Sequence, residues 1–171
     1  RHKTCVMRSD CEQIDEDLPQ VKVMPNDVLL GEVRKLIQEG HSVTLRVKGN
    51  SMLPFIYGGR DNVRFVNCSD YKVRDIVLAE VSKGVFVVHR IISIKDNRVT
   101  LMGDGNLYGV EHCYLDNLAA KVEVIVRGAR EIDPYSGYMR AAANFWWHIR
   151  GLRRWLLGLM RLTVLRNKIQ K

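Results

Sequence analysis

Cysteine is scarce in this chain of 171 residues, and its few cysteines are far apart. They lie at positions 5, 11, 68 and 113, where they form neither a CxxC pair nor a cysteine and histidine set at zinc spacing. Four scattered cysteines also exclude a disulfide framework. We therefore expect free thiols in a reducing compartment, with no metal and no cofactor. His112 and Cys113 are neighbours, but adjacent side chains on a strand point to opposite faces, and we interpret the two as unrelated.

A long hydrophobic run is missing from the N-terminal part of the chain. Residues 1–20 are polar and contain the acidic run at residues 15–17, so neither a signal peptide nor a transmembrane helix is predicted there. We expect residues 1–24 to form a flexible polar segment. The chain begins at Arg1 and not at methionine, so an anchor that precedes it stays an open alternative.

Acidic residues are absent after Asp133, although the chain has 19 of them and a net charge of +8. Residues 1–137 contain as many basic as acidic side chains, so the whole excess of positive charge lies in residues 138–171. This excludes a uniformly basic domain and predicts a neutral domain followed by a cationic segment. The length and the 46% hydrophobic content suit one packed domain, which we place at residues 25–132.

Hydrophobic periodicity predicts that this domain is mainly β. Apolar residues at helical spacing follow Pro25 and end at Gly40, and they predict a helix over residues 27–39. Alternation with a period of two then predicts short strands at residues 43–48, 62–67, 76–81, 85–94, 98–102 and 119–127. Short strands separated by turns favour a coiled antiparallel sheet or a small barrel over a doubly wound α/β fold.

The hexapeptide GNSMLP at residues 49–54 follows the first predicted strand. Gly49 permits an unusual backbone angle before Ser51, and Pro54 fixes φ after it, so we expect Ser51 on a stiff, exposed turn. A nucleophilic hydroxyl needs such a position, with a backbone N–H directed at the developing oxyanion. A capping serine in a glycine and proline turn explains the same residues, so both interpretations stay open.

A histidine interrupts the apolar strand VVHRII at residues 87–92. The ordinary pKa of imidazole, about 6.5, makes His89 suited to accept a serine proton at neutral pH. A packed structural histidine is the alternative. Arg90 alternates to the opposite face, where we expect a surface charge or a charge that steers a substrate carboxylate.

The segment LMGDGN at residues 101–106 leads from a strand into a glycine turn. Asp104 suits such a turn because its side chain can accept hydrogen bonds from its own backbone. A carboxylate at the end of a strand can also orient an imidazole. Taken singly, each of the three motifs is a weak signal.

Together and in this order, the three motifs resemble the signal-peptidase-like serine endopeptidases, a group that includes the self-cleaving repressors of the DNA-damage response. The similarity covers residues 43–128 and includes GGRD at residues 58–61 and VRDIV at residues 73–77. Bacterial signal peptidases and the repressors use a lysine as general base. His89 stands at that position here, which resembles the endoplasmic-reticulum and archaeal branch with its serine, histidine and aspartate. The resemblance implies a β-rich, coiled fold.

The resemblance also implies roles for individual residues. Ser51 matches the nucleophile, His89 the general base, and Asp104 the acid of the family's Gly-Asp-Asn turn, although one glycine is inserted before the asparagine here. The second aspartate of the histidine branch is missing, so Glu111 is the alternative third residue, with Asp104 preferred. The implied activity is hydrolysis of a peptide bond in a precursor peptide or protein through an acyl-enzyme, as in signal peptide processing.

The cationic segment at residues 138–171 is predicted to be an amphipathic helix. An apolar stripe lies opposite most of the arginines, with tryptophans near its boundaries, and consists of Phe145, Ile149, Leu152, Leu156, Leu159, Met160 and Thr163. The longest uncharged run after Arg140, residues 141–149, is far shorter than the ~20 apolar residues of a membrane span. We expect residues 141–168 to lie on an anionic membrane surface. Packing on the β domain or on a second subunit is the alternative, and nucleic acid is an unlikely partner because a nucleic-acid arm needs no Leu/Trp stripe.

These features predict a peptidase that matures a precursor at the cytoplasmic face of a membrane, because a cationic helix prefers the anionic cytoplasmic leaflet. If an N-terminal segment is missing, the alternative is an ordinary membrane-anchored signal peptidase. A self-processing or non-catalytic regulatory module of the same fold is the other function that stays open.

Overall fold

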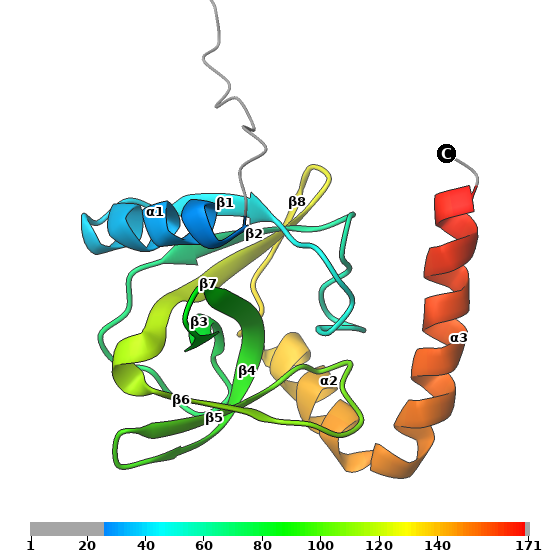
Figure 1. Cartoon of the computed structure of the whole chain (residues 1–171). Coiled ribbons are helices and arrows are strands. Elements are labelled where there is room, and N and C mark those ends of the chain that lie inside the picture. The colour runs from blue at the N-terminus through cyan, green and yellow to red at the C-terminus, as the bar shows by residue number, and fades with distance from the viewer. Residues whose placement is uncertain (1–25, 170–171) are drawn as a thin grey trace, which may run out of the picture.

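The structure is a computed structural model that describes residues 26–169 (Figure 1). In chain order the elements are α1 (Asn26–Gln38), β1 (Val43–Arg46), β2 (Asn62–Val66), β3 (Ile76–Ser82), β4 (Val85–Lys95), β5 (Arg98–Met102), β6 (Glu111–Tyr114), the short 3-10 helix η1 (Leu115–Asn117), β7 (Leu118–Arg127), β8 (Arg130–Ile132), α2 (Gly137–His148) and α3 (Arg150–Ile169). The flexible segment expected at residues 1–24 lies outside the described residues.

The strands form one antiparallel sheet of eight strands in the order β1-β2-β7-β3-β4-β5-β6, with β8 paired to β7. Within the described residues no pairing joins β1 to β6, so the sheet is open. In Figure 1, α1 and α3 lie on opposite sides of the strands. The expected mainly β fold with an antiparallel sheet is confirmed, and the small barrel is wrong.

The six expected strands and the N-terminal helix are present, with ends that differ by at most a few residues. Two further strands, β6 and β8, do not follow from the hydrophobic pattern. Only Cys113 is buried in β6, and β8 has three residues and no buried side chain. They are strands because they form hydrogen bonds to β5 and β7, and not because their apolar and polar residues alternate.

Two apolar clusters form the core. The larger combines Val33 of α1 with the inner faces of the strands, and it reaches Trp146 of α2 and Leu157 of α3. The smaller lies among β3, β4, β5 and β6 and includes Ile91 and Leu101. The C-terminal helices therefore belong to the same core as the sheet.

The loop between β1 and β2 closes on itself and carries the GNSMLP hexapeptide. The amide of Val47 donates to the carbonyl of Asp61 at 3.1 Å, and the amide of Gly59 donates to the carbonyl of Val47 at 2.8 Å. A Cβ on Gly58 would collide with the backbone of Gly49, so only glycine lets the two ends of the loop approach so closely. This close approach holds the hexapeptide in one position relative to the sheet.

Asp61 is a fully buried carboxylate at the end of this loop. It accepts hydrogen bonds from the Tyr57 amide at 2.9 Å, from Arg60 Nε at 2.7 Å and from Arg127 Nη2 at 2.9 Å. Burial raises the pKa of Asp61, but these hydrogen bonds outweigh it and lower the pKa from 3.8 to about 2. Asp61 therefore ties the loop to β7 as a charged group.

The cationic segment is two helices and not the single helix that the sequence predicted. The chain leaves helical geometry at Ile149, with φ −85° and ψ 37°, between α2 and α3. Trp146, Trp147 and Leu157 are buried; of the expected stripe, Phe145, Leu152 and Leu159 are exposed, whereas Ile149 and Leu156 pack partly against the core. Among the described residues, no helix is both long enough and apolar enough to cross a membrane.

We predict that Asp61→Asn lowers the free energy of unfolding by about 2 kcal/mol at pH 7, because it weakens buried charge-assisted hydrogen bonds. The folded pKa lies below the unfolded value, so this contribution is present above about pH 4 and disappears as the pH falls toward 2. Urea titrations between pH 2 and 7 measure the difference between wild type and variant. Asp70→Asn is the control, because Asp70 pairs with Lys72 on the surface. A difference that stays constant from pH 7 to 2 would contradict this assignment.

Candidate functional site

Ser51 lies in the β1–β2 loop, between residues that enter the core. Met52 and Leu53 are buried, and Gly49 has a φ of +85°, a left-handed conformation that suits glycine. The Ser51 side chain itself is half-buried. Among the described residues, the Ser51 hydroxyl forms no hydrogen bond, so no described protein group holds the hydroxyl in place.

His89 lies in the middle of β4 and is 4% exposed. Its Nδ1 lies 2.9 Å from Oε2 of Glu111, whose side chain is 31% exposed at the edge of the site. An ionised carboxylate only accepts hydrogen bonds, so Nδ1 carries the proton and donates. In the neutral imidazole, Nε2 is then left with a free lone pair, which is the tautomer that a general base requires.

The register of the sheet explains why Glu111 reaches His89. Residues directly opposite each other on neighbouring strands share a face of the sheet, and so do residues two apart on one strand. Ile91 pairs with Leu101, and Leu101 pairs with Glu111. Since His89 lies two residues before Ile91, Glu111 and His89 share one face.

The Ser51 carbonyl oxygen and His89 Nε2 both lie beside Gly103. A Cβ at that residue would collide with the Ser51 carbonyl oxygen, and it would lie 3.0 Å from His89 Nε2 and 3.1 Å from Asn106 Nδ2. The imidazole Nε2 therefore lies beside the same glycine as the backbone of the serine loop. The residue between them has no side chain, and this absence allows the approach.

Gly105, the residue inserted into the Gly-Asp-Asn pattern, attaches the turn to the serine loop. Its amide donates to the Ser51 carbonyl at 2.7 Å. A Cβ on Gly105 would lie 2.7 Å from the Asn50 carbonyl oxygen. The inserted glycine therefore packs directly against the backbone of the serine loop.

Asp104 does not contact His89, and the preference for Asp104 as the partner of the imidazole is wrong. Its carboxylate accepts hydrogen bonds from Arg90, at 2.9 Å from Nε and 2.7 Å from Nη2. Met102, two residues before Asp104, pairs with Arg90, so Asp104 follows the face of the sheet opposite His89. The alternative third residue, Glu111, is the one at hydrogen-bonding distance.

Arg90 is 4% exposed, so the expected surface charge is also wrong. Its Nη1 donates to the carbonyl of Arg74 at 3.0 Å, while its other two nitrogens donate to Asp104. Burial lowers the pKa of Arg90, and the charge and hydrogen bonds of Asp104 raise it by more. The guanidinium of Arg90 is therefore buried with hydrogen-bond partners, as a buried charge requires.

The C-terminal helices hold the same turn from another side. Trp146 Nε1 donates to the carbonyl of Asp104 at 2.8 Å. Arg153 Nη2 donates to the carbonyls of Asp104 and Asn106, at 2.6 and 3.0 Å. The sequence analysis did not predict this contact, because Arg153 is not among the residues of the expected apolar stripe.

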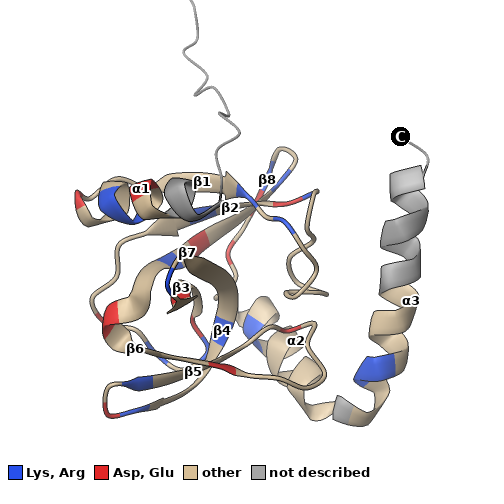
Figure 2. Ribbon diagram, in the orientation of Figure 1, with Lys and Arg blue, Asp and Glu red and all other residues tan. Residues whose placement is uncertain are grey.

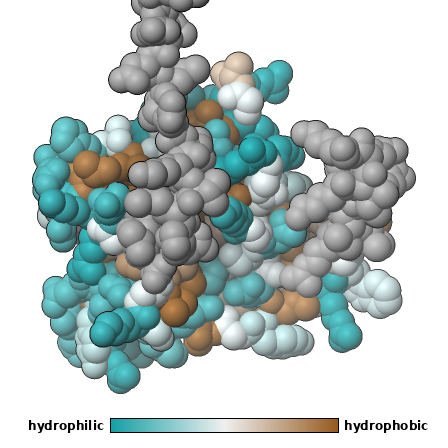
Figure 3. All heavy atoms as spheres, turned by 45° about the horizontal axis from the view of Figure 1, so that its top comes forward, coloured by the Kyte–Doolittle hydropathy of each residue, from teal (hydrophilic) through white to brown (hydrophobic). Residues whose placement is uncertain are grey.

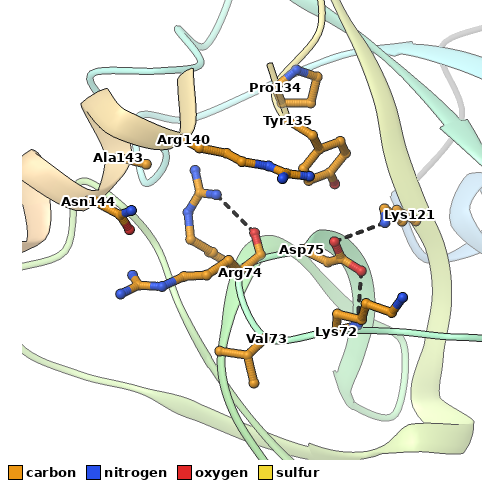
Figure 4. Close-up of a pocket in the computed structure, with 11 residues that line it drawn as sticks. Lys72, Val73, Arg74, Asp75, Lys121, Pro134, Tyr135, Arg140, Ala143 and Asn144 are labelled. Atoms are coloured by element: carbon orange, nitrogen blue, oxygen red, sulfur yellow. Dashed lines mark hydrogen bonds and ion pairs between the residues drawn. The ribbon is translucent and has the colours of Figure 1, made fainter. Parts of the chain in front are cut away.

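A pocket of about 500 Å³ lies beside Arg90, and Ser51, His89 and Glu111 do not line it (Figure 4). Four further cations line it: Lys72, Arg74, Lys121 and Arg140. Asp75 pairs with Lys121 at 2.9 Å, whereas Arg74 and Arg140 form no ion pair with another described residue. The pocket therefore has an excess of positive charge and is separate from the serine site.

The site contains groups for nucleophilic chemistry: a half-buried hydroxyl, an imidazole in a defined tautomer and a carboxylate that orients it. Within the described residues, no three His, Cys, Asp or Glu side chains are grouped to hold a metal ion.

The chain matches no protein-family model, and no curated protein matches it.

We predict that Gly103→Ala disturbs the site and lowers the free energy of unfolding by about 2 kcal/mol, because its Cβ would collide with the Ser51 carbonyl. Gly31→Ala is the matched control: its Cβ meets nothing within 4 Å in helix α1, so that variant should be more stable by up to about 1 kcal/mol. Chemical denaturation measures both. Equal stability of Gly103→Ala and wild type would mean that the packing at Gly103 is looser than described.

Proposed function

We propose that this protein is a serine endopeptidase of the signal-peptidase-like type, with Ser51 as nucleophile and His89 as general base. One observation carries the proposal: the Ser51 carbonyl oxygen and His89 Nε2 both lie beside Gly103, where its Cβ would be, and His89 Nδ1 lies 2.9 Å from Glu111 Oε2. A serine, a base and a group that orients the base are the three parts of acyl-transfer catalysis.

The reaction proceeds through an acyl-enzyme. His89 Nε2 accepts the Ser51 hydroxyl proton as Oγ attacks the peptide carbonyl carbon, and the imidazolium then donates this proton to the leaving amine. Water enters, gives a proton to His89 and attacks the ester; the C–O bond to Ser51 then breaks, and the imidazolium returns the proton to Ser51 Oγ. His89 accepts one proton and donates one in acylation, and again in deacylation, so no co-reactant besides water is needed.

Glu111 holds the imidazole in the required tautomer and stabilises the imidazolium. Asp104 has a positioning role, because its charge is neutralised by Arg90 inside the domain. This division differs from the serine, histidine and aspartate set of the histidine branch, since the carboxylate beside the imidazole is a glutamate.

The oxyanion needs hydrogen-bond donors on the same side as Ser51 Oγ. The backbone N–H of Ser51 is one candidate. The other is the side-chain amide of Asn106, whose Nδ2 lies 3.1 Å from the position of a Gly103 Cβ, beside His89 Nε2. Asn106 reaches this place because the Gly103–Gly105 turn is held by Arg90, Trp146 and Arg153.

The substrate class that fits is a precursor peptide or protein from which a leader is removed. Cleavage at the cytoplasmic face of a membrane suits the cationic C-terminal segment. A regulatory module that processes itself is the second candidate, and the tests below distinguish the two.

We predict that a fluorophosphonate probe labels wild-type protein at Ser51, with loss of fluoride to the solvent and of the hydroxyl proton to His89. Ser51→Ala should abolish labelling, and His89→Gln should slow it by at least about 100-fold. Ser42→Ala, which changes an exposed serine before β1, is the control and should label as fast as wild type.

Intact masses are measured in the same samples. A fragment cut within residues 1–40 that depends on Ser51 would favour the self-processing module over an enzyme that acts on other chains. Labelling of Ser51→Ala at the wild-type rate would remove the proposal.

We predict opposite effects for the two candidate acids. Glu111→Gln should slow labelling by at least about 100-fold with little loss of stability, because Glu111 lies at the edge of the site. Asp104→Asn should lower the free energy of unfolding by about 3 kcal/mol, because it leaves Arg90 buried without its partner. The folded fraction of Asp104→Asn should retain most of its labelling rate. The reverse pattern, with a stable but unreactive Asp104→Asn, would return Asp104 to the catalytic role.

A further inference from the structure

Large apolar side chains are exposed along the C-terminal helices, where a domain would normally bury them. The exposed fractions are 66% for Phe145 of α2 and 61%, 79% and 63% for Leu152, Trp155 and Leu159 of α3. Leu152, Trp155 and Leu159 are spaced three and four residues apart, so they lie on one side of α3. We call the three residues of α3, Leu152, Trp155 and Leu159, the apolar face.

The apolar face is not a part of the core that failed to pack. Each helix already buries another side: Trp146 of α2 is 5% exposed, and Arg153 and Leu157 of α3 are 2% and 1% exposed. Residue 157 lies 200° from residue 155 around the helix, so the buried and the apolar sides of α3 point in different directions. The helices are held on the domain, and the apolar face still lacks a partner among the described residues.

The charge of these helices indicates what covers the face. Residues 138–171 contain no acidic side chain and eight arginines and lysines. Figure 2 shows Lys and Arg but no Asp or Glu on the described parts of α2 and α3. A second copy would bring the same unopposed positive charge into a shared interface, which repels. An anionic surface neutralises it.

The aromatic residue on the face also fits a lipid interface. Indole favours the headgroup region of a bilayer, where its ring is half in contact with hydrocarbon and its N–H stays hydrated. Trp155 is the most exposed residue of the apolar face, and Arg154 beside it is exposed as well. Figure 3 shows that elsewhere on the visible face hydrophobic residues form separate patches among hydrophilic ones.

We propose that the apolar face docks on the surface of an anionic membrane, with α3 lying in the interface. Hydrophobic burial of the face and attraction between the cations and anionic headgroups act together. This proposal does not depend on the peptidase activity, because binding can be measured without any substrate.

Docking places the serine site close to the bilayer. Trp146 and Arg153, on the other side of these helices, donate to the carbonyls of the turn at Asp104 and Asn106. A helix with its side chains is about 10 Å wide. The turn therefore lies about one helix diameter from the lipid, which suits a substrate held at the membrane surface.

Trp155 supplies a direct probe of docking. Trp146 and Trp147 are buried, at 5% and 8% exposed, so Trp155 is the one exposed tryptophan of the three in the chain. We predict a blue shift of the emission of the full chain when vesicles with about one third phosphatidylglycerol are added. Trp155→Phe should lose the shift but still sediment with the vesicles, which shows that the shift comes from this residue.

Variants separate the apolar and the electrostatic contributions. Leu152→Ser with Leu159→Ser should weaken sedimentation with anionic vesicles at least tenfold. The matched control replaces two exposed apolar residues outside these helices, Leu36→Ser with Val85→Ser, and should bind as wild type does. Vesicles of phosphatidylcholine alone, or 0.5 M salt, should also weaken binding at least tenfold.

Three results would overturn the proposal. They are equal binding of the Leu152/Leu159 variant and wild type, binding that is indifferent to anionic lipid, and a concentration-dependent blue shift without vesicles together with a dimer in sedimentation equilibrium. The last result would assign the apolar face to a second copy of the chain. Labelling of Ser51 by the probe is unaffected by any of them, so the two proposals fail separately.

Discussion

A buried ion pair between Arg90 and Asp104 holds the turn on which the candidate site is assembled. Both side chains are almost completely excluded from solvent, and Arg90 also donates to the Arg74 carbonyl. The serine loop packs on this turn through the Gly105 amide, and the C-terminal helices donate to its carbonyls. Because Gly103 has no side chain, the Ser51 carbonyl and His89 Nε2 can lie close to the position that a Cβ would take. Any change that moves the turn moves all of these contacts together.

The alternation of β4 gives one strand two tasks. His89 directs its imidazole to the face where Glu111 lies, and Arg90 directs its guanidinium to the other face, where it pairs with Asp104. The imidazole of the candidate site and the buried guanidinium are thus adjacent in sequence and lie on opposite faces of the strand. This arrangement separates the carboxylate that bonds to the imidazole from the carboxylate that pairs with Arg90, although both follow β5 within ten residues.

The helix and six strands could be predicted from sequence, and Ser51 and His89 could be named as candidates, because periodicity and local turn chemistry depend on neighbouring residues. The third residue could not. Glu111 belongs to β6, whose alternation is too weak to be recognised, and its place beside His89 depends on register across three strands.

The prediction that Arg90 is a surface charge was wrong for a related reason: its partner is 14 residues away, so a charged residue in a strand looked like a surface residue. The C-terminal segment was correctly predicted to be amphipathic. Which side of it packs on the domain could not be predicted, because that depends on hydrogen bonds to the carbonyls of Asp104 and Asn106, which are distant in sequence.

The central claim is that Ser51 forms an acyl-enzyme with the help of His89. Rapid mixing with a p-nitrophenyl ester of a short acyl peptide measures this step directly, because nitrophenolate leaves as the acyl group is transferred to Oγ. The account predicts a burst of about one nitrophenolate per folded protein, with the acyl group mapped to Ser51 by peptide mass. Folded protein that gives no burst, or an acyl group mapped to any other residue, would contradict it.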